Sequence, residues 1–153
     1  MKFNKFEIIE KIFEGHGTIL YRANNRDMPE NVIIKVAKTP EAAMRLKNEY
    51  DILKGLDVEG ASKVNGYYPH SEDPYIIVSD MDGLPLINNM EKFKNYPNDR
   101  LCGIFINLAT IVSRIHKENI IHKDIKPSNI LYKEDNDSVR IIDFGISSQY
   151  DFK

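Results

Sequence analysis

The stretch from residue 120 to residue 131, IIHKDIKPSNIL, constrains this chain more than any other part of its sequence. It begins and ends with pairs of apolar residues, and polar residues fill most of the space between them. Pro127 lacks the backbone N–H that a helix interior needs, so a helix cannot run through the middle. We therefore expect a loop that is anchored at both ends by buried, strand-like residues and that exposes three polar side chains, Asp124, Lys126 and Asn129.

A second motif, DFG, begins at Asp143, fourteen residues after Asn129, and follows two isoleucines. This set of groups suits phosphoryl transfer, because Asp124 can accept a hydroxyl proton and Lys126 can sit on the transferring phosphate. The oxygens of Asn129 and Asp143 can hold Mg²⁺, a hard cation that takes few protein ligands. Each residue alone is better explained as part of a polar surface loop, whereas the complete string indicates a catalytic site.

The run NVIIKVA, residues 31–37, is continuously apolar around a single lysine, Lys35. Burying a lysine is costly unless it is paired, although a lysine at a sheet edge can also extend its ammonium into water. Apolar residues spaced three and four apart predict a helix from Pro40 to Leu56. Glu49 lies at the edge of the apolar face of this helix. It is therefore the natural partner for Lys35, although most helix glutamates are simply solvated.

These strings resemble those of eukaryotic-type protein kinases. HKDIKPSNIL resembles the family's catalytic loop, IDFG its metal-binding motif, and VIIK the strand whose lysine contacts the α- and β-phosphates of ATP. KNEYDIL resembles the helix that supplies the ion-pair glutamate. Lys126, two residues after Asp124, resembles the lysine that the serine/threonine branch of the family has at this position. Lys123 stands where the family usually has arginine, and lysine is a point charge without the planar fork that pairs with a phosphorylated loop.

The resemblance covers nearly the whole chain and implies an α+β, protein-kinase-like fold. It implies a five-stranded antiparallel small lobe with one helix at residues 1–79, a hinge at 80–83, and the beginning of a helical large lobe at 84–153. In the hinge, the backbone of Asp80 and Met81 would hold adenine. The implied cofactors are ATP and Mg²⁺, and the implied acceptor is a serine or threonine hydroxyl of a protein. Among kinases, the chain most resembles domains that open large bacterial signalling proteins with further sensor and histidine-kinase modules.

The hairpin predicted around the turn EGHG matches the family's phosphate-covering loop incompletely. Gly15 and Gly17 are its candidate phosphate contacts. When the chain is aligned on YRA, only Gly15 coincides with a family glycine, and Phe13 and Thr18 occupy the positions of the other two. The same pattern is equally typical of a plain hairpin turn.

The sequence from Arg100 to Lys117 predicts a helix whose apolar residues cover roughly 220° of its circumference, far more than the stripe of about 100° that a surface helix needs. We expect such a helix to be covered from several sides, and Asp99 to cap its start. The family's activation segment and remaining large-lobe helices have no counterpart before the end of the chain at Lys153. We therefore expect this sequence to be the N-terminal portion of a kinase domain.

Composition excludes several other classes of protein. A chain of 153 residues with net charge −2 is typical of about one ordinary domain and gives no case for nucleic-acid binding. Cys102 is the only cysteine, so no internal disulfide can form. No apolar run approaches the roughly 18 residues of a membrane span, and we expect a cytoplasmic protein. The histidines lack metal-ligand spacing, and the acidic turn at 135–137 lacks the later glycine and glutamate of a calcium loop.

Two alternatives to a protein kinase remain. A nucleotide-binding or regulatory module that transfers nothing would explain the poor match of the glycine loop. A small-molecule phosphotransferase of related fold is disfavoured by Lys126 and by the Pro-Ser-Asn continuation that follows it.

Overall fold

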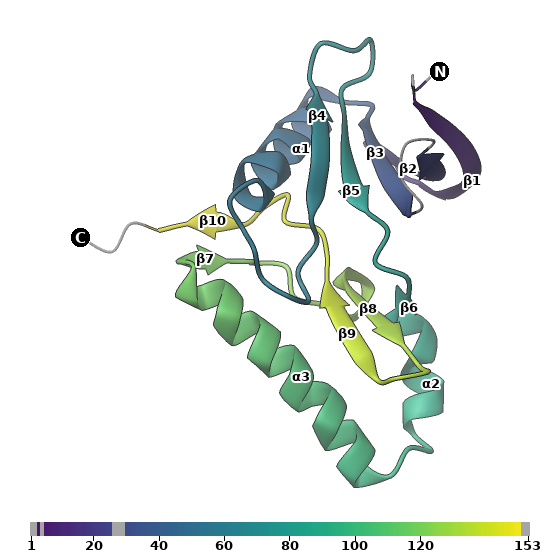
Figure 1. Ribbon diagram of the computed structural model, residues 1–153, viewed down its shortest axis with the longest axis vertical. Coiled ribbons are helices and arrows are strands. Elements are labelled where there is room, and N and C mark those ends of the chain that lie inside the picture. Colours follow the sequence, from purple (N-terminus) through teal and green to yellow (C-terminus); the bar gives the residue numbers. More distant parts are fainter. Residues whose placement is uncertain (1–2, 4, 26–29, 151–153) are drawn as a thin grey trace. The chain divides into compact units, whose positions relative to one another are not determined.

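The computed structural model describes residues 3, 5–25 and 30–150 (Figure 1). The chain divides into two compact units. The N-terminal unit comprises Met1–Lys54 and Lys63–Asp80, and the C-terminal unit comprises Gly55–Ser62 and Met81–Lys153.

The segment Gly55–Ser62 was expected in the N-terminal unit, but its contacts assign it to the C-terminal one. The backbone N–H of Ile141 donates to the carbonyl of Gly60 at 2.7 Å, and the N–H of Ser62 donates to the carbonyl of Ile141 at 3.0 Å. Backbone pairing over long sequence distance therefore places these residues, and local sequence patterns do not report such pairing.

The N-terminal unit is built on one five-stranded antiparallel sheet with the strand order β1-β2-β3-β5-β4. A short turn joins β1 to β2, and β-branched residues fill the central strands β3 and β5, as a pleated and buried surface favours. This confirms the expected small-lobe architecture. The strands are β1 (Phe6–Glu14), β2 (Thr18–Asn25), β3 (Asn31–Ala37), β4 (Val64–Tyr68) and β5 (Tyr75–Ser79).

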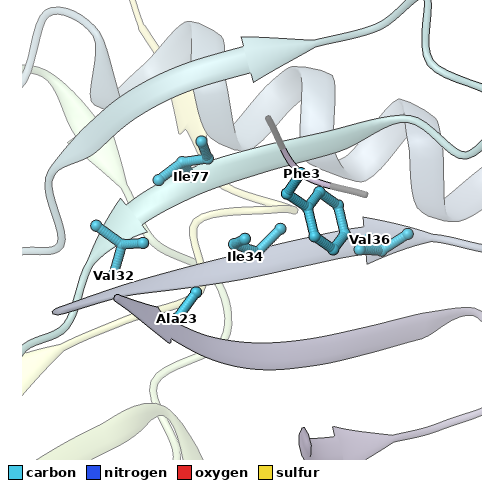
Figure 2. Close-up of a cluster of buried hydrophobic side chains, with 6 residues drawn as sticks. All are labelled: Phe3, Ala23, Val32, Ile34, Val36 and Ile77. Atoms are coloured by element: carbon cyan, nitrogen blue, oxygen red, sulfur yellow. The ribbon is translucent and has the colours of Figure 1, made fainter. Parts of the chain in front are cut away.

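The two faces of this sheet carry different side chains, because alternate residues of a strand point in opposite directions. Figure 2 shows the apolar cluster on one face, where the ring of Phe3 lies over β3 close to Ile34 and Val36. The opposite face carries Lys35, whose cross-strand partners are Leu20 and Ile76. The members of the apolar cluster are Phe3, Ala23, Val32, Ile34, Val36 and Ile77.

Helix α1 (Pro40–Leu53) packs against the sheet of the N-terminal unit. The side chain of Thr39 caps it by accepting the N–H of Ala42 at 3.2 Å, and Pro40 occupies the first turn, where its missing N–H costs nothing. The helix ends three residues before the predicted Leu56. Gly55 has low helix propensity and weakens the end of the predicted range.

The C-terminal unit combines two small sheets with helices and short 3₁₀ turns. One sheet has the order β6-β8-β9, and the other pairs β7 with β10. Its strands are β6 (Leu84–Pro85), β7 (Ile120–Ile121), β8 (Ile130–Lys133), β9 (Ser138–Ile141) and β10 (Ser148–Gln149). Its helical elements are η1 (Leu86–Asn89), α2 (Met90–Phe93), α3 (Asn98–Lys117) and η2 (Pro127–Asn129).

Helix α3 is buried on one face only within the part of the chain that the structure describes. Its buried side chains recur at helical spacing and are Ile104, Ile111 and Ile115. Phe105 and Ile106 are exposed, so the expected cover from several sides is absent among the described residues. The prediction that Asp99 caps α3 was wrong, because Pro97 is the N-cap residue. None of the helices in the described ranges is long and apolar enough to span a membrane.

An ion pair fastens the start of α3 to the turn between β8 and β9. The guanidinium of Arg100 donates to Asp137 at 2.8 Å and lies 3.9 Å from the centroid of the Tyr96 ring. The hydroxyl of Tyr132 donates to the same carboxylate. Hydrogen bonds from Arg100 and then from Tyr132 lower the pKa of Asp137. The acidic turn thus fastens the start of α3 to the β8–β9 hairpin.

Candidate active site

The loop between residues 120 and 131 has the expected anchors at both ends. Strand β7 pairs with β10, and β8 pairs with both β6 and β9. Pro127 begins the 3₁₀ turn η2, at the first position of a helical turn, where proline is tolerated. Lys123 adopts φ 68°, a left-handed conformation that turns the chain sharply before Asp124.

Asp124, Lys126 and Asn129 come together in this loop. The ammonium of Lys126 lies 2.8 Å from the Asp124 carboxylate, and the Asn129 amide donates to the same oxygen at 2.8 Å and to the Asp124 carbonyl at 3.0 Å. The hydrogen bond from Lys126 is the main cause of the lowered pKa of Asp124. Partial burial raises this pKa, and the hydrogen bond from Asn129 lowers it further. Asp124 is therefore a carboxylate at neutral pH, half-exposed and ready to accept a hydrogen bond.

His122 ties this loop to the DFG motif. The N–H of Asp124 donates to Nδ1 of His122 at 3.2 Å, so the ring proton must lie on Nε2, which donates to the carbonyl of Ile142 at 3.0 Å. The imidazole also packs edge-on against the buried ring of Phe144, with centroids 4.6 Å apart. The histidine therefore fixes two backbone segments that are twenty residues apart.

Asp143 follows directly on this connection. The N–H of Ile142 donates to the carbonyl of Asn129 at 3.0 Å, so the two expected magnesium ligands belong to adjoining backbone segments. Asp143 adopts φ 68°, a left-handed conformation that is uncommon for residues other than glycine and is often found at functional sites. Ser147, which the sequence analysis did not single out, donates to the carbonyl of His122 at 3.0 Å. No local pattern distinguishes that serine from a solvated one.

The chemistry of these donors fits Mg²⁺. Because the amide nitrogen of Asn129 donates twice to Asp124, only its oxygen remains for a cation, and Asp143 adds a carboxylate. Oxygen ligands of this type are those that Mg²⁺ takes alongside phosphate and water. Across the described residues, no group of three or more His, Cys, Asp or Glu side chains could hold a metal ion.

The N-terminal unit contains the expected ion pair between Lys35 and Glu49. Nζ of Lys35 lies 2.5 Å from Oε1 of Glu49, and the two side chains are 9% and 1% exposed. β3 places the lysine on the sheet face that α1 covers, and Glu49 reaches it from the buried side of that helix. An ammonium held rigidly in this way can present its remaining hydrogens to phosphate oxygens.

The residues expected at the hairpin turn and the hinge already make contacts within the chain. Gly15 donates its N–H to the carbonyl of Thr18 at 3.0 Å, and the carbonyl of Gly17 accepts the N–H of Lys38 at 2.9 Å. The carboxylate of Asp80 accepts from Nε of Arg22 at 2.6 Å. Met81 is half-buried and begins the second segment of the C-terminal unit.

The catalytic-type loop, the DFG segment and the buried lysine–glutamate pair are the features of a phosphoryl-transfer protein of the kinase class. Comparison with known families agrees with this class. A family model described as "protein kinase domain" matches residues 6–153, and the chain belongs to this family. Enzymes of this family use ATP and Mg²⁺ in general.

Three curated relatives illustrate the relationship. A probable serine/threonine-protein kinase of Clostridium perfringens (strain 13 / Type A) is 28% identical over 97% of this chain and 22% of its own length. The CDPK-related kinase 3 of Arabidopsis thaliana is 30% identical over 94% of this chain and 26% of its own length. Myosin light chain kinase A of Dictyostelium discoideum is 27% identical over 93% of this chain and 50% of its own length. The chain thus spans half or less of the length of each of these relatives.

Proposed function

We propose that this chain carries the nucleotide-binding and catalytic residues of a protein serine/threonine kinase, which transfers the γ-phosphoryl group of ATP to a hydroxyl of a protein substrate. One observation carries the proposal: Asp124 is held by Lys126 and Asn129 in a loop that His122 connects to the segment preceding Asp143. A solvated polar loop would need no such set of mutual contacts.

In this proposal Asp124 orients the substrate hydroxyl and accepts its proton. The lowered pKa keeps the carboxylate ionised, and Asn129 fixes its orientation. Lys126 supplies positive charge beside the transferring phosphate and is half-exposed, so its ammonium can move from Asp124 to a phosphate oxygen. Positioning and preorganised charge of this kind account for most of the rate of phosphoryl transfer.

Asn129 and Asp143 would hold Mg²⁺, which neutralises charge on the phosphates when it is bound. Lys35, fixed by Glu49, would contact the α- and β-phosphates. The backbone of Asp80 and Met81 would contact adenine, and the turn that contains Gly15 and Gly17 would lie against the nucleotide. The buried position of the Lys35–Glu49 pair supports this assignment, because a lysine is seldom buried without a specific partner.

The substitution Asp124→Asn tests the proposal in the longest natural chain that contains these residues. It keeps the size and hydrogen-bonding shape of the side chain but removes the base, and we expect transfer of radiolabelled phosphate from ATP to casein to fall about 10²–10⁴-fold. ATP binding, followed as a thermal shift with Mg·ATP, should persist. Asp135→Asn in the exposed β8–β9 turn is the matched control and should leave transfer unchanged. Undiminished transfer in Asp124→Asn would refute the assigned role.

A module that binds nucleotide without transfer is the second candidate, because the turn expected to meet the phosphates is closed by its own hydrogen bond from Gly15 to Thr18. The same two measurements separate the candidates. A thermal shift with Mg·ATP and no transfer by the unsubstituted chain would favour the module, whereas both signals together favour the kinase.

A further inference from the structure

The register of β1 places an aromatic ring on the same face of the sheet as Lys35. The pairing of β1 with β2 shifts between Lys11 and Phe13, so Ile12 is an extra residue in a bulge. Beyond the bulge, Phe13 is opposite Leu20, and Leu20 is opposite Lys35. Directly opposed residues share a face. Phe13 is therefore two strands, or roughly 10 Å, from Lys35 on the face where the nucleotide is proposed to bind.

The ring of Phe13 lies against Gly15. A Cβ atom added at Gly15 would stand 2.8 Å from both Cε1 and Cζ of that ring, and the next atom, the carbonyl oxygen of Thr18, would be 3.9 Å away. The φ angle of Gly15 is outside the left-handed region, so the backbone itself does not require glycine there. Contact with the ring is thus the reason that the structure gives for a glycine at this position.

The turn is also tied down by its own backbone. The N–H of Gly15 is used by the Thr18 carbonyl at 3.0 Å, and the carbonyl of Gly17 is used by the N–H of Lys38 at 2.9 Å. A Cβ at Gly17 would lie 3.4 Å from Oγ1 of Thr39, the residue that caps α1. The turn therefore rests on the start of that helix and does not offer the Gly15 amide to a ligand.

We propose that Phe13 and Gly15 form a closed apolar cap on the hairpin, in which Gly15 seats the ring of Phe13 and does not donate to phosphate. Phe13 is 53% exposed and so presents an apolar surface on the face where the nucleotide is proposed to bind. The nucleotide part of the proposal rests on the proposed function. Without an amide from Gly15, the triphosphate adds less to affinity. The exposed apolar ring of Phe13 lowers the affinity for the charged triphosphate further and so sets how strongly the chain distinguishes ATP from adenosine.

A double-mutant cycle on thermal stability tests the cap independently of any ligand. Gly15→Ala should lower the unfolding midpoint by about two degrees in the unsubstituted chain, because the half-exposed ring must turn away from the added Cβ and lose its contact with the turn. In a Phe13→Ala background the same substitution should change the midpoint by less than about one degree. Gly55→Ala, where nothing lies within 4 Å of the added Cβ, is the matched control and should behave alike in both backgrounds. An equal loss from Gly15→Ala in both backgrounds, or no loss in either, would overturn the cap.

Nucleotide titrations test the consequence for binding. Phe13→Gly should tighten Mg·ATP binding about three- to tenfold, because the exposed apolar ring no longer lies on the face proposed for the charged triphosphate, and should leave adenosine binding unchanged. Ile9→Gly is the matched control, since Ile9 is the extra residue in the other bulge of the same strand and is 52% exposed. Unchanged or equally changed affinity for both ligands in Phe13→Gly would overturn the role in discrimination. If no variant bound nucleotide, the proposed function would fail, and the stability cycle would still decide whether the cap exists.

Discussion

The ion pair between Lys35 and Glu49 allows the sharpest quantitative prediction about the N-terminal unit. Lys35→Met and Glu49→Leu each remove one charge and keep a side chain of comparable size. The double variant removes both charges. We expect each single variant to be severely destabilised and the double variant to recover most of the loss.

The magnitude follows from burial. With exposed fractions of 9% and 1%, both charged groups are almost fully removed from water, and their N–O separation is 2.5 Å. Removing one partner leaves an uncompensated buried charge, which costs about 3–5 kcal/mol, whereas replacing a buried pair with apolar residues is often neutral or stabilising. The cross-strand partners of Lys35, Leu20 and Ile76, are apolar and can pack against a methionine.

Equilibrium unfolding in urea, followed by circular dichroism, measures these quantities. The double variant should lie within about 1 kcal/mol of the unsubstituted chain, so the two substitutions should couple by several kcal/mol. Lys47→Met, which breaks an exposed pair with Asp51 on the outside of α1, is the control and should cost less than about 1 kcal/mol. Additive losses in the double variant would show that the two groups do not stabilise each other.

Two further predictions concern the C-terminal unit. Asp137 has a lowered pKa in the folded chain because Arg100 donates to it. The stability that this carboxylate contributes is therefore present at neutral pH and is lost as the pH falls through the lowered pKa. Asp137→Asn should flatten the acid limb of a plot of urea midpoint against pH, and an unchanged limb would contradict this. Gly60 has φ 93°, and an added Cβ would stand 2.5 Å from the side chain of Ile111, so Gly60→Ala should destabilise the chain by about 2 kcal/mol or more. Gly103→Ala, in an open position of α3, should stabilise it by up to about 1 kcal/mol. Similar urea midpoints for the two variants would show that neither backbone strain nor contact with Ile111 requires glycine at position 60.

The chemistry of the candidate site was readable because it is concentrated in short strings. Asp124, Lys126 and Asn129 lie within six residues, and each belongs to a motif whose residue types match one reaction. The contacts in the structure are equally local, since Lys126 and Asn129 both bind the carboxylate of Asp124. The pairing of Lys35 with Glu49 was predictable for a different reason: a charge inside an apolar strand requires an opposite charge nearby.

Other features depended on pairings that no local pattern encodes. The brace from His122 to Ile142 spans twenty residues, and its hydrogen bonds are visible only when both segments are in place. The bulge at Ile12 reverses which residues of β1 share a face with Lys35, and alternation alone would have assigned them differently. The cap of α3 was misassigned because Asp99 and Pro97 both suit a helix start, and only the backbone path distinguishes them.

By itself, the amino-acid sequence predicted the protein kinase family, the candidate catalytic loop at residues 120–131, the partner of the buried Lys35 and the five strands of the N-terminal unit. These depend on residue type and short spacing, which a linear string carries in full. The bracing role of His122 was an expectation, but the tertiary structure alone decided that its partner is the carbonyl of Ile142. It alone also decided that Gly55–Ser62 joins the C-terminal unit and that Gly15 accommodates an aromatic ring. Each of these follows from atoms brought together by strand register and backbone pairing, and register is set by the whole sheet and not by any one segment.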